Sequence, residues 1–338
     1  NKEMIFLITG GSGGHFFPAL ALSQNLKKNY RFLVDDRIKK LAIKSRINYF
    51  PVLSKRHKKS IFSIGYNFYN FFLSFFRSLI LMIKFKPKIV IGFGGYTTIA
   101  PMIAAKALGV KTIIHEQNSI MGRANRLLSI FVDRVAITYK KTRFSKKSSI
   151  FTGIPIRNPK KTYHYNSKKK IILIIGGSQG AKVFSEIIPK IISKLDYTFL
   201  KKISLVQQIK IEDKLKLTTN YNKLNIDCKL KPFFDDIYNE IFNSSIIICR
   251  CGSSTLAEIE LFKKFCFLFP LPESMDNHQH LNAIEFKKTN QCIIVDEKKI
   301  DYSHLAKEIK KNLLRKRKAI NNVKNKNLFN SLIDEMLA

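Results

Sequence analysis

The sequence predicts an α/β protein made of two doubly wound, parallel-sheet domains. Three observations support this fold class: the length of the chain, a repeated strand–glycine–helix unit, and a series of short apolar runs separated by helix-length segments. A chain of 338 residues suits two domains of about 100–200 residues each. Hydrophobic residues make up 45% of the chain, so each half can bury a core.

The repeat relates the two halves of the chain. Residues 5–14 (IFLITGGSGG) align without gaps with residues 171–180 (IILIIGGSQG), and seven of the ten positions are identical. Each copy is an apolar run, a glycine-rich turn and a helical segment, which we expect at 181–195 in the second copy. The predicted domains are 1–158 and 159–320, joined near the proline-containing linker 155–167. Residues 321–338 are a candidate helix that packs back on the first domain.

Short apolar runs mark the remaining strands. They are continuously apolar, which is typical of strands buried on both faces of a parallel sheet. They lie at 31–34, 88–91, 111–115, 134–138 and 149–152 in the first half, and at 226–230, 245–249, 265–269 and 292–295 in the second. In such sheets ligands bind at the carboxyl ends of the strands, so we expect functional residues there.

Basic residues dominate the charge of the chain. The 60 Lys and Arg residues outweigh 24 Asp and Glu, for a net charge of +36, and only 13 of the 60 are Arg. Proteins that read nucleic acid usually depend on Arg, so we expect no nucleic-acid partner. A solvated lysine surface and an anionic membrane surface remain as explanations.

The cysteine pattern and the N-terminus bear on the cellular compartment. The five cysteines form no C-x-x-C pair, which argues against a structural zinc site and a secreted disulfide framework and favours a reducing cytosol. The chain enters its first apolar run almost at once, so we expect no secretion signal.

The segment 61–85 is the most apolar of the chain, with only Arg77 and Lys84 charged. Its length would allow a bilayer crossing, but positive charge flanks both ends equally and the next strand has to join the first sheet. A polar stripe follows helical spacing and comprises Ser63, Asn67, Asn70, Ser74 and Arg77/Ser78. Basic residues flank the segment at both ends: Lys55, Arg56, Lys58 and Lys59 before it, and Lys84, Lys86 and Lys88 after it. Two interpretations stay open: a helix buried in the domain, and a helix half packed and half dipping into the membrane interface.

Glycine-rich turns follow three of the predicted strands. Gly10-Gly-Ser-Gly-Gly-His15 opens a helix, whose N-terminal N–H groups favour an anion and whose dipole favours a neutral His15. It is not the dinucleotide fingerprint, because no glycine occupies the sixth position. The turns Gly92-Phe-Gly-Gly-Tyr-Thr-Thr98 and Gly176-Gly-Ser-Gln-Gly180 are similar. Three such turns predict a site for more than one phosphate-bearing ligand.

Two polar segments also end strands. Cys251-Gly-Ser-Ser-Thr-Leu-Ala-Glu258 opens a helix, either with Thr255 and Glu258 as a capping box or with a diphosphate on its N–H groups and a ribose on Glu258. The run His115-Glu-Gln-Asn118 suits either a solvated loop or sugar recognition.

Taken in order, these motifs resemble the MurG family, the bacterial UDP-N-acetylglucosamine:lipid I N-acetylglucosaminyltransferases of peptidoglycan synthesis. The resemblance covers nearly the whole chain. It further includes Pro18-Ala-Leu-Ala21, Gly122, Asn125-Arg126, Gly153-x-Pro155-x-Arg157, Cys249-Arg250 and Asp276-x-x-Gln279-x-x-Asn282-Ala283. It implies a GT-B fold, in which two Rossmann-like domains face a cleft. It also implies an inverting, cofactor-free enzyme that needs no protein-bound metal and acts peripherally at the cytoplasmic face of the bacterial inner membrane.

The resemblance also implies roles for individual residues. His15 would be the base that takes the proton of the muramyl 4-hydroxyl, and Gly94, Gly95 and Tyr96 would face the acceptor, lipid I. The UDP-N-acetylglucosamine site would comprise Ser12, Gly13, Gly14, Asn118, Arg157, Ser178, Phe234, Ser253, Ser254, Thr255, Leu256, Ala257, Glu258 and Gln279. The helix at 61–85 and its flanking lysines would dock on an anionic membrane surface.

Two rival functions are consistent with parts of this pattern. Another UDP-sugar enzyme of the same fold, such as a glycolipid synthase or a UDP-sugar epimerase, would share the glycine turns. A basic peripheral protein that binds nucleic acid or membrane without catalysis would share the charge, but it would bind no nucleotide sugar.

Overall fold

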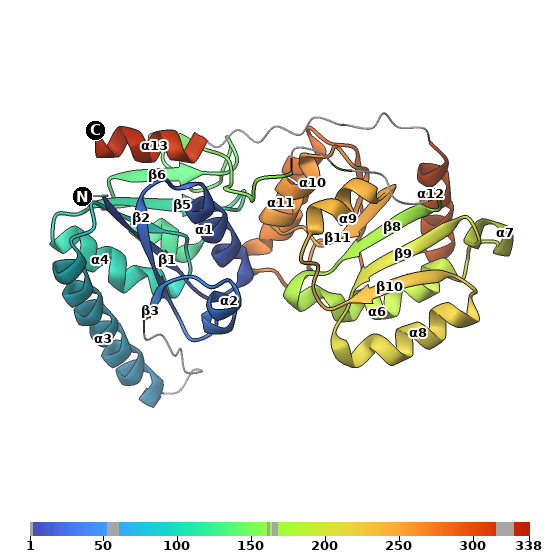
Figure 1. Ribbon diagram of the computed structural model, residues 1–338, viewed down its shortest axis with the longest axis horizontal. Coiled ribbons are helices and arrows are strands. Elements are labelled where there is room, and N and C mark those ends of the chain that lie inside the picture. Colours follow the sequence, from blue (N-terminus) through green and yellow to red (C-terminus); the bar gives the residue numbers. More distant parts are fainter. Residues whose placement is uncertain (1–2, 53–60, 161–162, 164–167, 316–327) are drawn as a thin grey trace. The chain divides into compact units, whose positions relative to one another are not determined.

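A computed structural model describes residues 3–52, 61–160, 163, 168–315 and 328–338, without the side chains of 61–64 and 178–181. The chain divides into two compact units (Figure 1). The first comprises residues 1–158 and 326–338, and the second comprises 159–325. The predicted linker 155–167 lies partly outside the described residues.

The first unit is built on a sheet of seven strands that pair in parallel in the order β3-β2-β1-β4-β5-β6-β7. Successive strands need crossover helices, so the helices cover both faces of the sheet. The strands are β1 (Met4–Thr9), β2 (Asn29–Val34), β3 (Tyr49–Pro51), β4 (Ile89–Gly92), β5 (Lys111–Glu116), β6 (Arg134–Ile137) and β7 (Ile150–Phe151). The helices are α1 (Gly13–Asn25), α2 (Lys39–Lys44), α3 (Ile61–Phe85), α4 (Ile99–Ala107), α5 (Arg123–Leu128) and α13 (Leu328–Leu337).

Two apolar layers enclose this sheet. One face is covered by α1, α2 and α13, and the other by α3, α4 and α5. The last helix, α13, packs into the first layer through Phe329, Leu332, Ile333 and Met336, which are all buried. The C-terminal end of the chain is thus part of the core of the first unit (red helix in Figure 1).

The second unit repeats the design with six strands that pair in parallel in the order β10-β9-β8-β11-β12-β13. The strands are β8 (Lys170–Ile175), β9 (Ile203–Gln208), β10 (Asp227–Lys231), β11 (Ile246–Cys249), β12 (Cys266–Leu268) and β13 (Cys292–Ile294). The helices are α6 (Gly177–Ile192), α7 (Tyr197–Leu200), α8 (Lys214–Lys223), α9 (Ile237–Asn243), α10 (Ser253–Glu260), α11 (His278–Lys287) and α12 (Tyr302–Leu314). Helices α6, α7, α8 and α12 cover one face, and α9, α10 and α11 cover the other.

The predicted fold class is therefore confirmed, with local differences. The strands β3 and β9 were not predicted, and α6 begins at Gly177, four residues before the expected start. The capping-box interpretation of residues 255–258 is wrong, because α10 begins at Ser253 with Gly252 as its N-cap and no side-chain cap bond.

Helix α3 buries its polar side and exposes its apolar side, the reverse of an ordinary amphipathic helix on a protein core. Its polar residues Asn70, Ser74 and Ser78 are buried, on the side where α3 packs on α4. Large apolar side chains at least half exposed line the outer side: Phe68, Tyr69, Phe72, Phe76, Ile80 and Ile83. The stretch Gly65–Phe85 is long and apolar enough to span a bilayer, with 22% of its most apolar window buried. The interpretation as a helix buried in the domain is therefore wrong.

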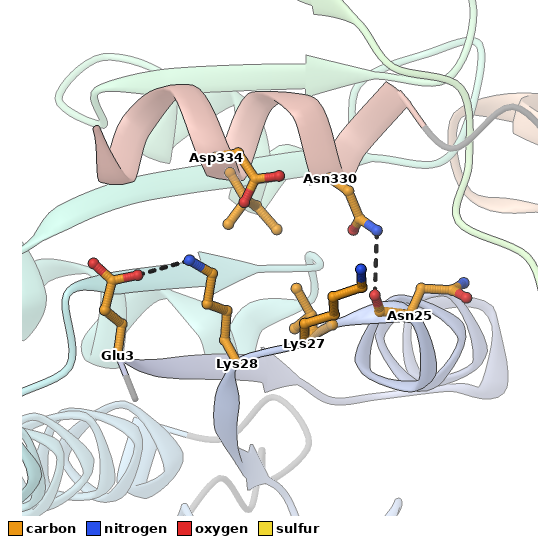
Figure 2. A pocket seen from close by; sticks show the side chains of 8 residues that line it. Glu3, Asn25, Lys27, Lys28, Asn330 and Asp334 are labelled. Atoms are coloured by element: carbon orange, nitrogen blue, oxygen red, sulfur yellow. Dashed lines mark hydrogen bonds and ion pairs between the residues drawn. The ribbon is translucent and has the colours of Figure 1, made fainter. Parts of the chain in front are cut away.

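A cavity of about 680 Å³ lies beneath α13 in the first unit (Figure 2). Its walls carry balanced charge, and Lys28 is paired with Glu3 at 2.8 Å. Its lining residues are Glu3, Asn25, Leu26, Lys27, Lys28, Asn330, Ile333 and Asp334. Glu3 and Lys28 immediately precede β1 and β2, so the cavity lies at the amino ends of the strands, opposite the glycine turns.

Candidate active site

The first glycine turn follows β1 and is held by residues from two neighbouring strands. A Cβ on Gly10 would lie 2.0 Å from Oγ1 of Thr97 and 2.8 Å from Oδ2 of Asp35, so only glycine fits there. The next residue, Gly11, donates its N–H to Oδ2 of Asp35 at 2.9 Å. Asp35 is buried at the end of β2 and also pairs with Arg37 at 2.5 Å. The sequence reasoning did not identify Asp35 or Arg37 as part of this turn.

His15 lies in the first turn of α1 and packs on the second glycine turn. A Cβ on Gly94 would lie 3.1 Å from Cε1 of His15, and one on Gly95 would lie 3.2 Å from the carbonyl oxygen of Gly10. Gly94 and Gly95 have φ of +90° and +88°, a region that side chains disfavour. Gly10 and Gly95 can approach each other this closely because neither residue carries a side chain.

Gln117 connects the imidazole of His15 to the end of β5. Its Oε1 lies 3.0 Å from Nδ1 of His15. Its Nε2 donates to the carbonyl oxygens of Phe93, at 2.9 Å, and His115, at 3.1 Å, and lies 3.2 Å from Nδ1 of His115. Gln117 is 2% exposed, so these protein groups surround its amide.

His115 is fully buried, and Nε2 of its ring lies 2.9 Å from the carbonyl oxygen of Gly153. Burial lowers the pKa of His115 to about 4, although the bond to Gly153 opposes this shift and nearby His15 adds to it. Phe93 and Phe329 pack against the ring at centroid distances of 5.8 and 5.3 Å. At neutral pH the ring is therefore uncharged, because water is excluded from it.

Glu116 organises the loop that follows β5. Its Oε1 accepts the backbone N–H of Asn118 at 2.9 Å, and its Oε2 accepts the N–H of Gly122 and a side-chain N–H of Asn125, both at 2.9 Å. Of the polar run 115–118, only Asn118 is partly exposed. Three of these four side chains therefore support the site from inside the protein, and the solvated-loop interpretation does not apply to them.

In the second unit, the predicted donor residues 253–258 follow the carboxyl end of β11, and Gln279 of α11 contacts the same turn. The backbone N–H groups of Ser253 and of the residues after it form the N-terminus of α10. Asn282 donates to Oγ of Ser253 at 3.0 Å and to the carbonyl oxygen of Cys251 at 3.1 Å. Oε1 of Gln279 accepts the N–H groups of Cys251 and Leu271, both at 3.1 Å. These bonds hold the start of α10 against α11 and the loop after β12.

Arg250 is a buried cation beside this loop. Its Nη1 donates to the carbonyl oxygens of Phe269, at 3.2 Å, and Pro270, at 3.4 Å. The guanidinium lies 5.3 Å from the ring centroid of Phe184 and forms an ion pair with Glu297. Arg250 thus ties the ends of β11 and β12 to the segment after β13.

The predicted substrate-binding residues divide between the units. Ser12, Gly13, Gly14, Gly94, Gly95, Tyr96, Asn118 and Arg157 belong to the first unit, and Ser178, Phe234, Ser253, Ser254, Thr255, Leu256, Ala257, Glu258 and Gln279 belong to the second. Phe234 and Leu256 are buried in the apolar core under α9 and α10. Ser178 lies in the first turn of α6, and its side chain is outside the described part of the structure.

All five cysteines lie in the second unit, where Cys249, Cys251 and Cys266 are buried and Cys228 and Cys292 are half-buried. Burial raises the pKa of Cys251 and Cys266 well above the usual value, and that of Cys292 to about 11. Thiols in this state are poor nucleophiles. In the described ranges, no group of three or more His, Cys, Asp or Glu residues is placed to hold a metal ion.

Known proteins are similar to this chain in both fold and sequence. The glycosyltransferase family 28 N-terminal domain matches residues 5–137, and the corresponding C-terminal domain matches residues 171–336. Among solved structures, MurG of Acinetobacter baumannii superimposes with a TM-score of 0.73 over 92% of this chain and 91% of that chain, at 22% identity. A UDP-N-acetylglucosamine 2-epimerase of Methanocaldococcus jannaschii superimposes with a TM-score of 0.65 over 99% and 100%, at 12% identity. These likenesses confirm the GT-B fold of two Rossmann-like domains.

The curated relatives that are similar to this chain in sequence are transferases. The UDP-N-acetylglucosamine–N-acetylmuramyl-(pentapeptide) pyrophosphoryl-undecaprenol N-acetylglucosamine transferase of Rickettsia canadensis is 35% identical over 91% of this chain and 90% of that protein. Proteins of the same name in Rickettsia bellii and Wolbachia pipientis are each 34% identical, over 99% and 87% of this chain and 100% and 85% of their own lengths. On this evidence the chain belongs to the MurG family of glycosyltransferases.

Proposed function

We propose that the protein transfers N-acetylglucosamine from UDP-N-acetylglucosamine to the 4-hydroxyl of the N-acetylmuramic acid of lipid I, forming lipid II. The observation that carries the proposal is the contact between His15 and Gln117 at 3.0 Å, beside two glycine turns at a helix N-terminus. It combines a base held in a fixed orientation with backbone suited to an anionic substrate.

The first unit would receive lipid I. The turns at 10–14 and 92–95 follow the carboxyl ends of β1 and β4, and α1 begins within the first turn, so its N-terminal N–H groups lie at the same edge of the sheet. This arrangement suits the pyrophosphate of the acceptor. Gly94, Gly95 and Tyr96 would face it, and His15 would lie beside the muramyl 4-hydroxyl.

The second unit would hold the donor. The N–H groups at Ser253, Ser254 and Thr255 would bind the diphosphate, as the start of a helix does, and Glu258 one turn later would bind the ribose diol. Because Gln279 and Asn282 fix the backbone of this turn from α11, the donor site is preformed on that side. Arg157 and Ser178 would add contacts to the diphosphate, and Asn118 and Gln279 to the transferred sugar.

The reaction would be a single displacement with inversion. The 4-hydroxyl oxygen attacks the anomeric carbon from the face opposite UDP, its proton passes to His15, and the bond from the anomeric carbon to the diphosphate oxygen breaks. Charge then grows on the leaving diphosphate, where helix N-termini and Arg157 stabilise it. The product is a β-1,4 linkage.

We further propose that α3 docks on an anionic membrane surface. Its exposed aromatic side chains suit the apolar boundary of a bilayer, and the polar side chains of Asn70, Ser74 and Ser78 are buried away from it. Arg77 and Lys84 of the same helix are exposed and suit anionic headgroups. Lys84, Lys86 and Lys88 at its end are described, whereas Lys55, Arg56, Lys58 and Lys59 lie outside the described residues. Each lysine near anionic headgroups adds about 1 kcal/mol. Such docking would place the first unit where its lipid-linked substrate resides.

The test is to measure UDP release from UDP-N-acetylglucosamine with and without a short-chain, water-soluble lipid I analogue. We expect release only when the acceptor is present, with a β-1,4-linked disaccharide as product. Release without acceptor would indicate hydrolysis or epimerisation, as in the structurally similar epimerases, and would refute the transferase assignment. Donor binding, measured by calorimetry, checks that the second unit is functional in the same preparation.

A further inference from the structure

We infer that Gln117 is a positioning residue that sets the tautomer of His15, so that Nε2 is the ring nitrogen that accepts the substrate proton. The inference deepens the proposed function and rests on the role of His15 as the base. Three linked contacts carry it, from Gly153 to His115, from His115 to Gln117, and from Gln117 to His15.

The orientation of the Gln117 amide is decided by its surroundings. Two backbone carbonyl oxygens, of Phe93 and His115, lie 2.9 and 3.1 Å from Nε2. Carbonyl oxygens only accept hydrogen bonds, so the NH2 group has to face them, and a flipped amide would bring three oxygens together in a buried place. Oε1 therefore points to His15.

His115 strengthens this orientation from the other side. Its Nε2 lies 2.9 Å from the carbonyl oxygen of Gly153, which can only accept, so Nε2 carries the hydrogen. Because the buried ring is neutral, its Nδ1 is unprotonated and accepts from Gln117 at 3.2 Å. Every group around the Gln117 NH2 is thus an acceptor.

The consequence appears at His15. Oε1 of Gln117 is an acceptor, so the hydrogen between it and Nδ1 of His15 belongs to the ring. A neutral imidazole carries one N–H, so the lone pair is on Nε2. Neutral histidine in water favours the opposite tautomer, with the hydrogen on Nε2, and a ring in that form would have no base at that nitrogen.

In the reaction, Nε2 would take the proton of the muramyl 4-hydroxyl while the electron pair of that oxygen forms the glycosidic bond. The bond between the anomeric carbon and UDP breaks and UDP leaves with its electron pair. The imidazolium that forms keeps its Nδ1–H directed to Gln117, so the acceptor also stabilises the charged ring.

Nitrogen NMR of the full chain labelled on histidine nitrogens tests the inference without lipid I. We expect the neutral His15 ring, assigned by its absence from His15→Ala, to show a protonated Nδ1 and an unprotonated Nε2. In Gln117→Met, which keeps the volume but offers no acceptor, the Nε2–H tautomer should appear.

Kinetics separate positioning from structural damage. We expect Gln117→Met to lower kcat by about 10-fold or more, less than loss of the base itself, with KM for UDP-N-acetylglucosamine unchanged. Gln207→Met is the matched control, because Gln207 is equally buried in the second unit and should leave the His15 tautomer unaltered.

An Nε2–H tautomer in the wild-type protein, or a Nδ1–H form that persists in Gln117→Met, would overturn the inference. These two outcomes can be distinguished from a failure of the proposed function. If His15→Ala kept its turnover while the wild-type ring showed Nδ1–H, the base assignment would be wrong and the tautomer assignment would stand.

Discussion

Among single residues, we expect His15, the proposed base, to have the most direct effect on turnover. We predict that His15→Ala lowers kcat by about 10²–10⁴-fold, the usual contribution of a general base. Donor affinity should change little, because we propose that backbone groups of the second unit bind the diphosphate. UDP release and calorimetric donor binding measure the two quantities. His304→Ala, on an exposed face of α12, should retain full activity, and an active His15→Ala enzyme would exclude this base.

Glu297 is the counter-ion of a guanidinium with little access to water. Its side chain is 14% exposed and that of Arg250 is 7% exposed. We predict that Glu297→Gln lowers the free energy of unfolding by about 3 kcal/mol, because it leaves a buried charge without its partner. Urea unfolding measures the change. Glu308→Gln, in an exposed pair with Lys311, is the control and should have little effect. Equal effects of the two changes would contradict the buried-pair argument.

Residues 115–118 illustrate the limit of sequence reasoning at this scale. The sequence shows four polar residues at a strand end, which indicates a site. It does not show that His115, Glu116 and Gln117 turn inward, because the period of a strand assigns faces but not depth, and both faces of this sheet are covered. The feature that could have indicated their burial is that the run ends an inner strand of a parallel sheet, where buried polar side chains need hydrogen-bond partners from the protein.

Among the elements, α3 departs most from its sequence pattern. Spacing alone predicts a polar stripe facing water, yet the stripe packs on α4 and the aromatic side faces outward. Small side chains such as Ser74 and Ser78 allow two helices to approach closely, whereas the large aromatic ones do not fit between them. The direction in which an amphipathic helix turns therefore depends on its neighbours and its solvent.

We predict that replacing Phe68, Phe72 and Phe76 together by Ser weakens binding to anionic vesicles by at least 10-fold. These rings lose apolar contact with the bilayer, and their exposure means that the fold does not need them. Vesicle co-sedimentation measures binding, and the urea midpoint should remain unchanged. Leu215→Ser, at an exposed apolar position of α8, is the matched control. Binding that is indifferent to salt and to anionic lipid would contradict the docking proposal.

Two strands escaped prediction for reasons particular to each. β3 has three residues and ends in Pro51 at the edge of its sheet, so it offers almost no apolar run to detect. β9 ends in Gln207 and Gln208, whose polar side chains interrupt the continuous apolar pattern expected of an inner strand. Buried Gln207 accepts a hydrogen bond from the Tyr221 hydroxyl at 2.5 Å, a contact between distant segments.

For the whole molecule, the stability of the first unit depends on the last helix of the chain. Phe329 of α13 is 1% exposed and packs on Phe93 and His115. We predict that Phe329→Ala costs about 3–5 kcal/mol of unfolding free energy. Calorimetry should show the transition of the first unit lowered and that of the second retained. Leu328→Ala, an exposed position beside it, is the control, and a loss confined to the second unit would contradict the packing.

Acid should destabilise the protein through His115. Its pKa is about 4 in the folded chain, against 6.5 for an ordinary histidine. Below pH 6.5 the histidine of the unfolded chain binds a proton that the folded chain does not take up until about pH 4. The free energy of unfolding therefore falls as the pH decreases through this window. The loss over that window is roughly 3 kcal/mol. Urea unfolding at a series of pH values measures this loss. The free energy of unfolding of His115→Gln should depend less steeply on pH, whereas that of the exposed control His304→Gln should follow the wild type. Identical pH curves for His115→Gln and the wild type would exclude His115 as the cause.

The sequence by itself determined the two parallel sheets, the glycine turns at their carboxyl ends and the family, because these depend on local patterns of apolar runs and ordered motifs. Tertiary structure alone decided which polar residues are buried, which side of α3 faces outward, and how His115, Gln117 and His15 connect. These features arise where strands and helices distant in the sequence meet. Burial and hydrogen-bond partners there are properties of the packed whole, which no local pattern records.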